Sequence, residues 1–182
     1  MMSDDFKKII SALKYWNIYL DRPDRDYVSR FKIQKLAYLC KSMGIPLNYN
    51  FTLYIKGPYS TGLSQDYFKE PQLIETLETN YVLNEKDLEI LDKINEYVLI
   101  HPITNNFEFE FLEAVSTARY LKNRYPDMLD DEIFAKIKEI KQHLKDSIIV
   151  IAINTVKKLF FNSEFLTEEV RREIDIWDKA ED

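Results

Sequence analysis

The chain contains 182 residues, of which 46% are hydrophobic and 31% are charged, and its formal net charge is −6. This length is enough for one well-buried core but short for two independent domains, and the composition is globular rather than disordered. The single cysteine excludes an internal disulfide and a four-thiolate zinc site. The longest apolar run, residues 148–153, is too short to span a bilayer, and the first residues do not resemble a signal peptide. We therefore expect a cytoplasmic protein that does not bind membranes.

Charge is unevenly distributed along the chain. Residues 1–60 carry ten Lys and Arg against five Asp and Glu, a net charge of +5, which leaves −11 for residues 61–182. The first part suits contact with phosphate or with an acidic partner, whereas the second would repel nucleic acid. An ordinary solvated surface would give the same asymmetry.

The first predicted element is an amphipathic helix near the start of the chain. Ser3 is a typical capping residue, and the two aspartates after it complement the positive end of a helix. Apolar residues recur with helical spacing, so we predict a helix from Ser3 to about Tyr19. A polar turn around Pro23 follows.

A second helix is predicted to begin near Asp26 or Ser29. It ends at Gly44, where a left-handed cap costs little, and Pro46 blocks its continuation. Its basic residues fall outside the apolar stripe, so we expect them to be exposed to solvent or to a partner. These residues are Arg30, Lys32, Lys35 and Lys41.

The apolar period changes to two over residues 49–56, which is typical of a half-buried strand. We expect residues 57–59 to end this strand, because proline cannot extend a central ladder. Ser60 then caps a helix that begins at Thr61. The prediction is a corner that turns the strand against the second helix and leaves Lys32 and Lys35 exposed beside it.

Weaker signals occupy the middle of the chain. Residues 73–77 suit a short helix, and residues 81–83 suit a strand that could pair with residues 50–56. A clear helix is predicted over residues 84–98, because it opens with a capping-box pattern and is closed by His101-Pro102.

The remaining elements are all predicted to be helical. Residues 107–111 alternate like a strand, but the longer pattern over residues 107–121 favours a helix, and another is predicted over residues 130–143. Residues 148–153 fit either a buried strand or a helix that starts near Ser147, and the spacing up to Phe160 favours the helix. A final acidic helix is predicted from a cap at Thr167 to about Trp177.

No catalytic, metal or cofactor site can be identified from the residues. Only three glycines occur, and neither phosphate-binding glycine motif is present. His101 and His143 are too distant in sequence for a zinc pair or a compact triad. Residues 139–141, Glu-Ile-Lys, are similar to a nuclease tripeptide, but that chemistry needs a strand and the pattern here is helical. We therefore expect no enzyme, no metal and no cofactor.

Glu113 differs from the other acidic residues in its position on a predicted helix. It lies beside the apolar stripe of its predicted helix, so we expect it to be partly buried. A buried carboxylate needs a partner, and Tyr59 or a basic side chain would serve.

Two segments resemble a known family. Residues 31–40, FKIQKLAYLC, and residues 57–63, GPYSTGL, resemble the K-[LI]-Q-K-L-x-Y-[LF] helix and the Y-G-P-[YV]-S-x-x-L corner of the SocA/Panacea antitoxin-like domains and the related YwgA-like proteins. Residues 109–121 and 131–141 are similar to a helix pair of the YwgA-like group. The matching positions of the corner are Lys32, Gln34, Lys35, Tyr38, Gly57, Pro58, Tyr59 and Ser60.

The resemblance implies a mainly α fold of the α+β class, with a small sheet and no catalytic centre. From the residues we predict about seven helices and two or three antiparallel strands. We expect one globular domain over residues 1–161, followed by an acidic C-terminal helix over residues 162–182 that packs on the body or on another subunit. The matching positions also have a structural interpretation, in which Gln34 and Tyr38 hydrogen-bond the turn and Gly57-Pro58 forms it.

Two functions are compatible with these observations. The leading hypothesis is a non-enzymatic regulator that binds a protein partner, such as a cognate toxin, as the Panacea group does. The alternative is a DNA-binding transcriptional regulator with a helix-turn-helix or winged element, although the net charge disfavours nucleic acid. Its phosphate contacts would come from Arg25, Arg30, Lys32 and Lys35. A homodimer is compatible with either function.

Overall fold

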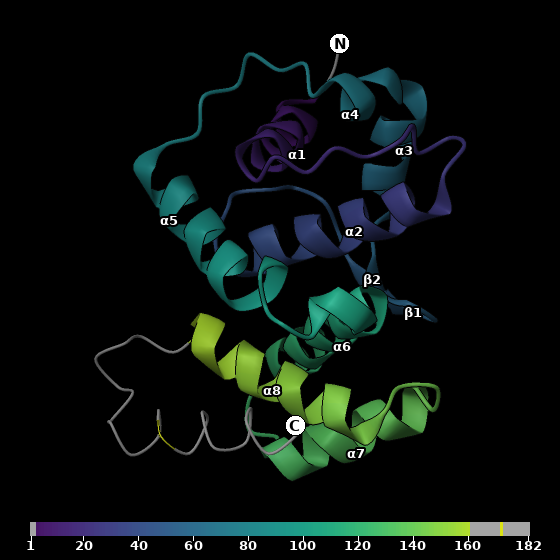
Figure 1. Cartoon of the computed structure of the whole chain (residues 1–182), viewed down its shortest axis with the longest axis vertical. Coiled ribbons are helices and arrows are strands. Elements are labelled where there is room, and N and C mark those ends of the chain that lie inside the picture. Colours follow the sequence, from purple (N-terminus) through teal and green to yellow (C-terminus); the bar gives the residue numbers. More distant parts are fainter. Residues whose placement is uncertain (1–2, 161–171, 173–182) are drawn as a thin grey trace. The chain divides into compact units, whose positions relative to one another are not determined.

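The computed structural model describes residues 3–160 and residue 172, and its architecture is mainly helical (Figure 1). Over these residues it contains eight α-helices, one π-helix and a two-stranded antiparallel sheet, which confirms the predicted class. The described residues divide into two compact units, with the boundary between Glu96 and Tyr97. The predicted boundary at residue 161 adjoins residues that are not described, and it stays a prediction.

The first unit is built around one central helix. Its elements are α1 (Asp4–Tyr15), α2 (Tyr27–Ser42), β1 (Thr52–Tyr54), β2 (Gly57–Tyr59), α3 (Thr61–Lys69), α4 (Gln72–Thr76) and α5 (Glu85–Ile94). Helix α2 contacts both β2 and α5, and α1 packs against α3. The side chains of Ile33, Leu36 and Leu39 are almost fully buried, so α2 supplies the centre of this core.

Four predicted helix starts are confirmed by side-chain caps. Ser3 accepts a hydrogen bond from the backbone of Phe6, and Asp26 accepts one from Ser29. Ser60 begins α3 in the same way, and Asn84 forms the predicted capping box with Asp87 at the start of α5. Each cap satisfies a backbone N–H that the first helical turn leaves without a partner.

The helix ends follow the backbone conformation more than the apolar pattern. Helix α1 ends at Tyr15 rather than near Tyr19, because Asn17 adopts a left-handed φ of 55°. Gly44 ends α2 as predicted, with a φ of 114°. Helix α5 ends at Ile94 and continues as the π-helix η1 (Asn95–Leu99), so the predicted segment to Val98 is helical but changes its winding.

The sheet differs from the prediction. Strand β1 pairs with β2 in the register Thr52↔Tyr59, Leu53↔Pro58 and Tyr54↔Gly57, whereas residues 81–83 contain no strand. Residues 57–59 therefore form the second strand of a hairpin instead of ending the first. Gly57 has a φ of 91°, a conformation that glycine adopts at little cost, and this allows the chain to reverse immediately after Ile55 and Lys56.

Within the described residues of the second unit, three α-helices contact one another. They are α6 (Thr104–Arg124), α7 (Asp130–Ile140) and α8 (Asp146–Phe160). Residues 107–111 and 148–153 are both helical, so the strand alternatives are excluded. Helix α6 starts at Thr104, before the predicted residues 107–121, and it has a kink at Phe107, where φ is −135° and ψ is 39°. Helix α7 ends three residues before the predicted His143.

The predicted final helix, with its cap at Thr167 and its end near Trp177, lies outside the described residues.

Candidate functional site

Most of the matching positions of the predicted corner meet at one place in the first unit. We call it the α2–hairpin corner and define it as Gln34, Lys35 and Tyr38 of α2 together with residues 57–60. The amide of Gln34 makes two buried hydrogen bonds to Ser60: Nε2 donates to the carbonyl over 2.9 Å, and Oε1 accepts from the backbone N–H over 2.8 Å. Gln34 therefore acts as a backbone partner for the residue at which the hairpin becomes helix α3.

Lys35 holds the middle of the second strand. In this register Leu53 and Pro58 form a pair without direct ladder hydrogen bonds, a position that suits proline because it has no N–H, and the Pro58 carbonyl points away from β1. Lys35 Nζ donates to that carbonyl over 2.8 Å, and it also lies 5.2 Å from the centre of the Phe31 ring. The lysine supplies the hydrogen bond that a third strand would otherwise provide.

The predicted exposure of the basic residues on α2 is wrong for Lys35. Only 2% of this residue is exposed, because the ammonium group turns inward to the hairpin backbone. Arg30 and Lys41 are half-buried, and each donates to a backbone carbonyl of its own unit, that of Pro23 for Arg30 and that of Tyr49 for Lys41. These three cations support the local fold, which removes much of the basic surface that the sequence suggested.

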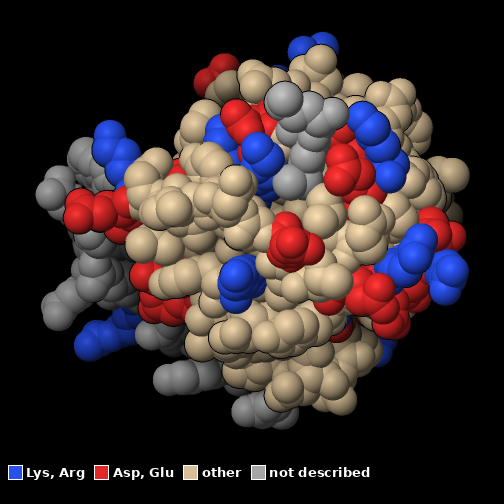
Figure 2. Space-filling model, turned by 90° about the horizontal axis from the view of Figure 1, so that it is seen from above, with Lys and Arg blue, Asp and Glu red and all other residues tan. Residues whose placement is uncertain are grey.

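The other predicted phosphate contacts are more accessible. Arg25 is exposed and Lys32 is half-buried. On the face shown in Figure 2, acidic and basic side chains are mixed, without a continuous basic field. Local ion pairs such as Lys7 with Asp4 and Arg22 with Asp24 contribute to this mixing in the first unit. A nucleic-acid interface would need a more concentrated positive surface than this.

Aromatic side chains complete the corner. Tyr38 is buried, and its ring makes an edge contact with Phe51, with the centroids 5.3 Å apart. The ring of Tyr38 thus packs on the segment that leads into strand β1. Tyr54 and Tyr59, which come from opposite strands, have centroids 5.4 Å apart. Behind them Tyr67 of α3 is fully buried, and burial raises the pKa of its hydroxyl.

The segment that leads into the hairpin is fixed by a carboxylate. The hydroxyls of Tyr49 and Ser3 both donate to Asp66 Oδ2 over 2.6 Å. Burial and the bond to Asp66 raise the pKa of the Tyr49 hydroxyl, so it keeps its proton. The hairpin is therefore anchored from α2 and, through this network, from α1 and α3.

The exposed end of the hairpin was not identified from the sequence. Ile55 is 84% exposed and Tyr54 is 53% exposed. The alternating pattern placed Ile55 in a longer strand, on the same side as Phe51 and Leu53, because Ile55-Lys56 contains none of the glycine, asparagine or proline residues that mark a turn. The only local signal was the glycine at position 57.

A second cluster of polar side chains is buried in the second unit. Glu113 of α6 is 3% exposed, and its Oε1 lies 3.5 Å from Nζ of Lys141, which is 2% exposed. The Nε2 atom of His143, on a side chain 42% exposed, lies 3.1 Å from the other carboxylate oxygen. The predicted burial of Glu113 and its need for a basic partner are confirmed. This cluster ties α6 to the segment after α7.

The nuclease-like tripeptide does not form a site. Glu139 lies on helix α7 and pairs with Lys136 over 3.0 Å at the surface, while Lys141 turns inward to Glu113. Among the described residues, no group of three or more His, Cys, Asp or Glu side chains could hold a metal ion. In the same part of the chain, no helix is long and apolar enough to cross a membrane.

The comparisons with known proteins found no relative of this chain. No family model, curated protein or solved structure matches the chain. The resemblance of the α2–hairpin corner to the SocA/Panacea and YwgA-like proteins therefore stays a prediction that rests on the residues named above.

Proposed function

We propose that this chain is a non-enzymatic regulator that binds a protein partner through the hairpin tip, defined as Tyr54 and Ile55. The observation that carries the proposal is the contrast between this tip and its support. The two apolar side chains are 53% and 84% exposed, yet the strands behind them are anchored by buried hydrogen bonds from Gln34 and Lys35.

Single exposed apolar side chains are common on protein surfaces, so exposure alone would not indicate a partner. Here, however, buried hydrogen bonds hold the hairpin behind the exposed side chains in a fixed position. A rigidly held loop loses little conformational entropy when it binds, and an aromatic and an aliphatic side chain that leave water together supply favourable free energy. A buried glutamine and a buried lysine hold the hairpin backbone, and the removal of these polar side chains from water costs free energy. Such a cost would be unexpected for a loop that has no function.

In the antitoxin-like form of the proposal, the protein partner is a toxin. This form is supported by the resemblance of the same corner to antitoxin-like domains, which neutralise a toxin by direct binding. The partner is then a protein that slows growth when it is expressed alone.

The test compares two apolar residues of almost equal exposure. Ile55 lies at the hairpin tip, and Val82, which is 85% exposed, lies in the segment before α5. The full chain, Ile55→Asp and Val82→Asp are each used to capture partners from extracts of the native cell, and the captured protein is then purified for affinity measurements. Substitutions at such exposed positions are expected to change the free energy of unfolding by less than about 0.5 kcal/mol.

The proposal predicts one stoichiometric partner that binds the wild type and Val82→Asp equally. Ile55→Asp is expected to weaken binding by about tenfold or more, because a charge replaces an apolar contact. Equal binding by all three proteins, or no stoichiometric partner, would contradict the proposal. The antitoxin-like form also predicts that co-expression of Val82→Asp, but not of Ile55→Asp, rescues growth from the partner.

A further inference from the structure

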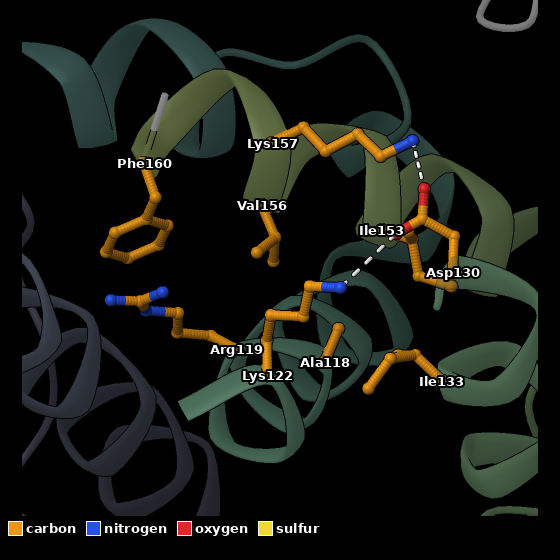
Figure 3. Close-up of a pocket in the computed structure, with 9 residues that line it drawn as sticks. All are labelled: Ala118, Arg119, Lys122, Asp130, Ile133, Ile153, Val156, Lys157 and Phe160. Carbon is orange, nitrogen blue, oxygen red and sulfur yellow. Dashed lines mark ion pairs between the residues drawn. The ribbon is translucent and has the colours of Figure 1, made fainter. Parts of the chain in front are cut away.

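The second unit contains a pocket of about 200 Å³ that residues of α6, α7 and α8 line (Figure 3). The charged side chains of its described lining contact other lining residues. Lys122 and Lys157 both form ion pairs with Asp130, and the guanidinium carbon of Arg119 lies 3.3 Å from the centre of the Phe160 ring. These contacts connect the three helices, which gives the charged groups a structural role.

In the first unit, the two edges of the hairpin differ in how they are protected. The outer edge of β2 faces α2, where Lys35 donates to the Pro58 carbonyl and the proline offers no N–H. Proline and charged side chains are common means by which proteins prevent a further strand from adding to a sheet. Residues 51–55, Phe-Thr-Leu-Tyr-Ile, contain neither. They are aromatic, β-branched or aliphatic, a composition that favours strand pairing.

The backbone of Leu53 provides a donor and an acceptor on the outer edge of β1. Leu53 lies opposite Pro58 in a pair without direct ladder hydrogen bonds, so its N–H and its carbonyl both point away from β2. Among the described residues, the sheet has only these two strands, and neither backbone group of Leu53 forms a hydrogen bond. A second extended backbone is the chemical group that would satisfy both at once.

The side chains next to Leu53 are exposed on one face of this edge. Thr52 and Tyr54 are both exposed, and the Tyr54 ring lies beside that of Tyr59 on the neighbouring strand, with the centroids 5.4 Å apart. A strand added to β1 would place every second side chain on this face. Aromatic and β-branched side chains are the types that pair best with such neighbours.

We propose that the protein partner binds by strand addition. An extended segment of the partner pairs with the outer edge of β1, forms hydrogen bonds with the N–H and the carbonyl of Leu53, and places apolar side chains at alternate positions beside Thr52 and Tyr54. This inference rests on the proposed function, because it specifies the partner surface that meets the hairpin. The backbone hydrogen bonds give affinity for any extended segment, and the side chains beside Tyr54 give specificity.

Amide hydrogen exchange of the full chain, followed by nuclear magnetic resonance, reports on the Leu53 N–H directly. The probe is the purified protein that the wild-type chain captures from its native cell. In the chain alone, the Leu53 amide should exchange faster than the ladder amides of Thr52 and Tyr59. In the complex its exchange should slow by about tenfold or more, whereas that of the Val82 amide should not change.

Proline at position 53 tests the backbone donor by substitution. Leu53→Pro removes the outward N–H without removing a hydrogen bond to β2, because the Leu53 N–H does not face that strand. Leu53→Ala is the matched control, since it also loses the leucine side chain but keeps the N–H. We expect Leu53→Pro to bind the probe about fivefold or more weakly than Leu53→Ala.

An ester analogue removes the same donor and keeps the side chain. Incorporation of the α-hydroxy acid of leucine at position 53 replaces the amide N–H by an ester oxygen. It should weaken binding to the probe by about fivefold relative to the wild type. This variant keeps the test decisive where the proline ring strains the strand.

The outcomes separate this inference from the proposed function. Suppose that Ile55→Asp weakens binding, but the Leu53 amide is not protected in the complex and the ester analogue binds like the wild type. The hairpin tip then binds a partner, and strand addition is overturned. Absence of a stoichiometric partner would overturn both. Sedimentation of the chain alone tests a second copy as the occupant, because a dimer that Leu53→Pro dissociates and Leu53→Ala does not would assign this edge to self-association and overturn the proposal.

Discussion

Lys35 and Pro58 are joined by a buried hydrogen bond, in which the lysine Nζ donates to the proline carbonyl over 2.8 Å. Each of the two residues is unusual at its position, proline in a strand and lysine in a core. Proline offers no N–H to the ladder, and lysine is rarely fully buried. Together they anchor the hairpin to α2, and the exposed tip of the hairpin is where we propose that a partner binds.

Replacement of Lys35 by methionine should destabilise the first unit. Methionine fills a similar volume but leaves the buried Pro58 carbonyl without this donor, so we expect the free energy of unfolding to fall by about 1–3 kcal/mol. Urea denaturation followed by circular dichroism measures the change. Lys14→Met, at an exposed lysine of α1, is the matched control and should stay within about 0.5 kcal/mol of the wild type. A Lys35→Met variant as stable as this control would show that the hydrogen bond contributes nothing.

Gln34→Glu should make stability depend on pH. The amide both donates to and accepts from Ser60, whereas a carboxylate can only accept and would face the Ser60 carbonyl. Burial next to a carbonyl should raise the pKa of the introduced carboxyl above its value of about 4.3 in the unfolded chain. The variant is then destabilised at neutral pH, by about 2 kcal/mol or more, and the penalty fades as pH falls through the raised pKa.

The measurement for Gln34→Glu is the urea midpoint of variant and wild type at about pH 7 and about pH 4. The matched control is Gln65→Glu, at an exposed position of α3. Its difference from the wild type should be small at both pH values. If the Gln34→Glu deficit is equally large at both pH values, the amide donor to Ser60 is not what the variant loses.

Asp26 should contribute stability that is lost in acid. Its Oδ2 accepts hydrogen bonds from the backbone N–H and the hydroxyl of Ser29, each over 2.6 Å, and these bonds lower the pKa of the Asp26 carboxyl. A lowered folded-state pKa means that the stabilisation is present above the unfolded-state pKa and disappears as pH falls through the folded-state value. Asparagine is an equally good helix cap but does not titrate. The urea midpoint should therefore fall more for the wild type than for Asp26→Asn between about pH 6 and about pH 2.5.

A second variant separates this effect from a general acid response. Ser29→Ala removes the hydroxyl that contributes most to the lowered pKa of Asp26. When Ser29→Ala is present in both proteins, the chain that keeps Asp26 and the chain that carries Asp26→Asn should therefore differ less in their pH dependence. Parallel pH profiles for the wild type and Asp26→Asn would contradict the assignment.

The buried pair of Glu113 and Lys141 should respond very differently from the surface pair near it. Glu113→Gln removes the carboxylate charge that faces the buried Lys141 ammonium, so we expect a loss of about 3–5 kcal/mol in the free energy of unfolding. Glu139→Gln breaks the Lys136–Glu139 pair, whose side chains are 41% and 68% exposed, and should cost less than about 1 kcal/mol. Denaturation of both variants under identical conditions measures the contrast.

The double substitution of Glu113→Leu with Lys141→Met provides a stricter check. Removing both charges together should be less harmful than removing either one, because neither member of the pair then stays buried opposite an apolar side chain. Additive losses would indicate that the two side chains are not energetically coupled.

Local chemistry in the sequence was sufficient to determine most helices and their starts. Ser3, Asp26, Ser60 and Asn84 cap helices because each side chain reaches a backbone N–H only two or three residues ahead, and this depends on nothing remote. The apolar spacing likewise identified residues 107–121 and 148–160 as helical, because a long run with a period of 3.6 cannot bury its apolar face as a strand.

The tertiary structure alone decided where the basic side chains of α2 lie. Lys35 lies outside the apolar stripe of α2 and was expected to be exposed to solvent or to a partner, but the hairpin covers that side of the helix and its Pro58 carbonyl accepts a hydrogen bond from the ammonium group. Strand β1 pairs with residues 57–59 instead of residues 81–83, because Gly57 allows an immediate reversal and a short loop is entropically cheaper to close than a long one. The identity of Lys141 as the partner of Glu113 is likewise set by a contact between segments that lie far apart in the sequence, and no periodicity within a single segment can report such a contact.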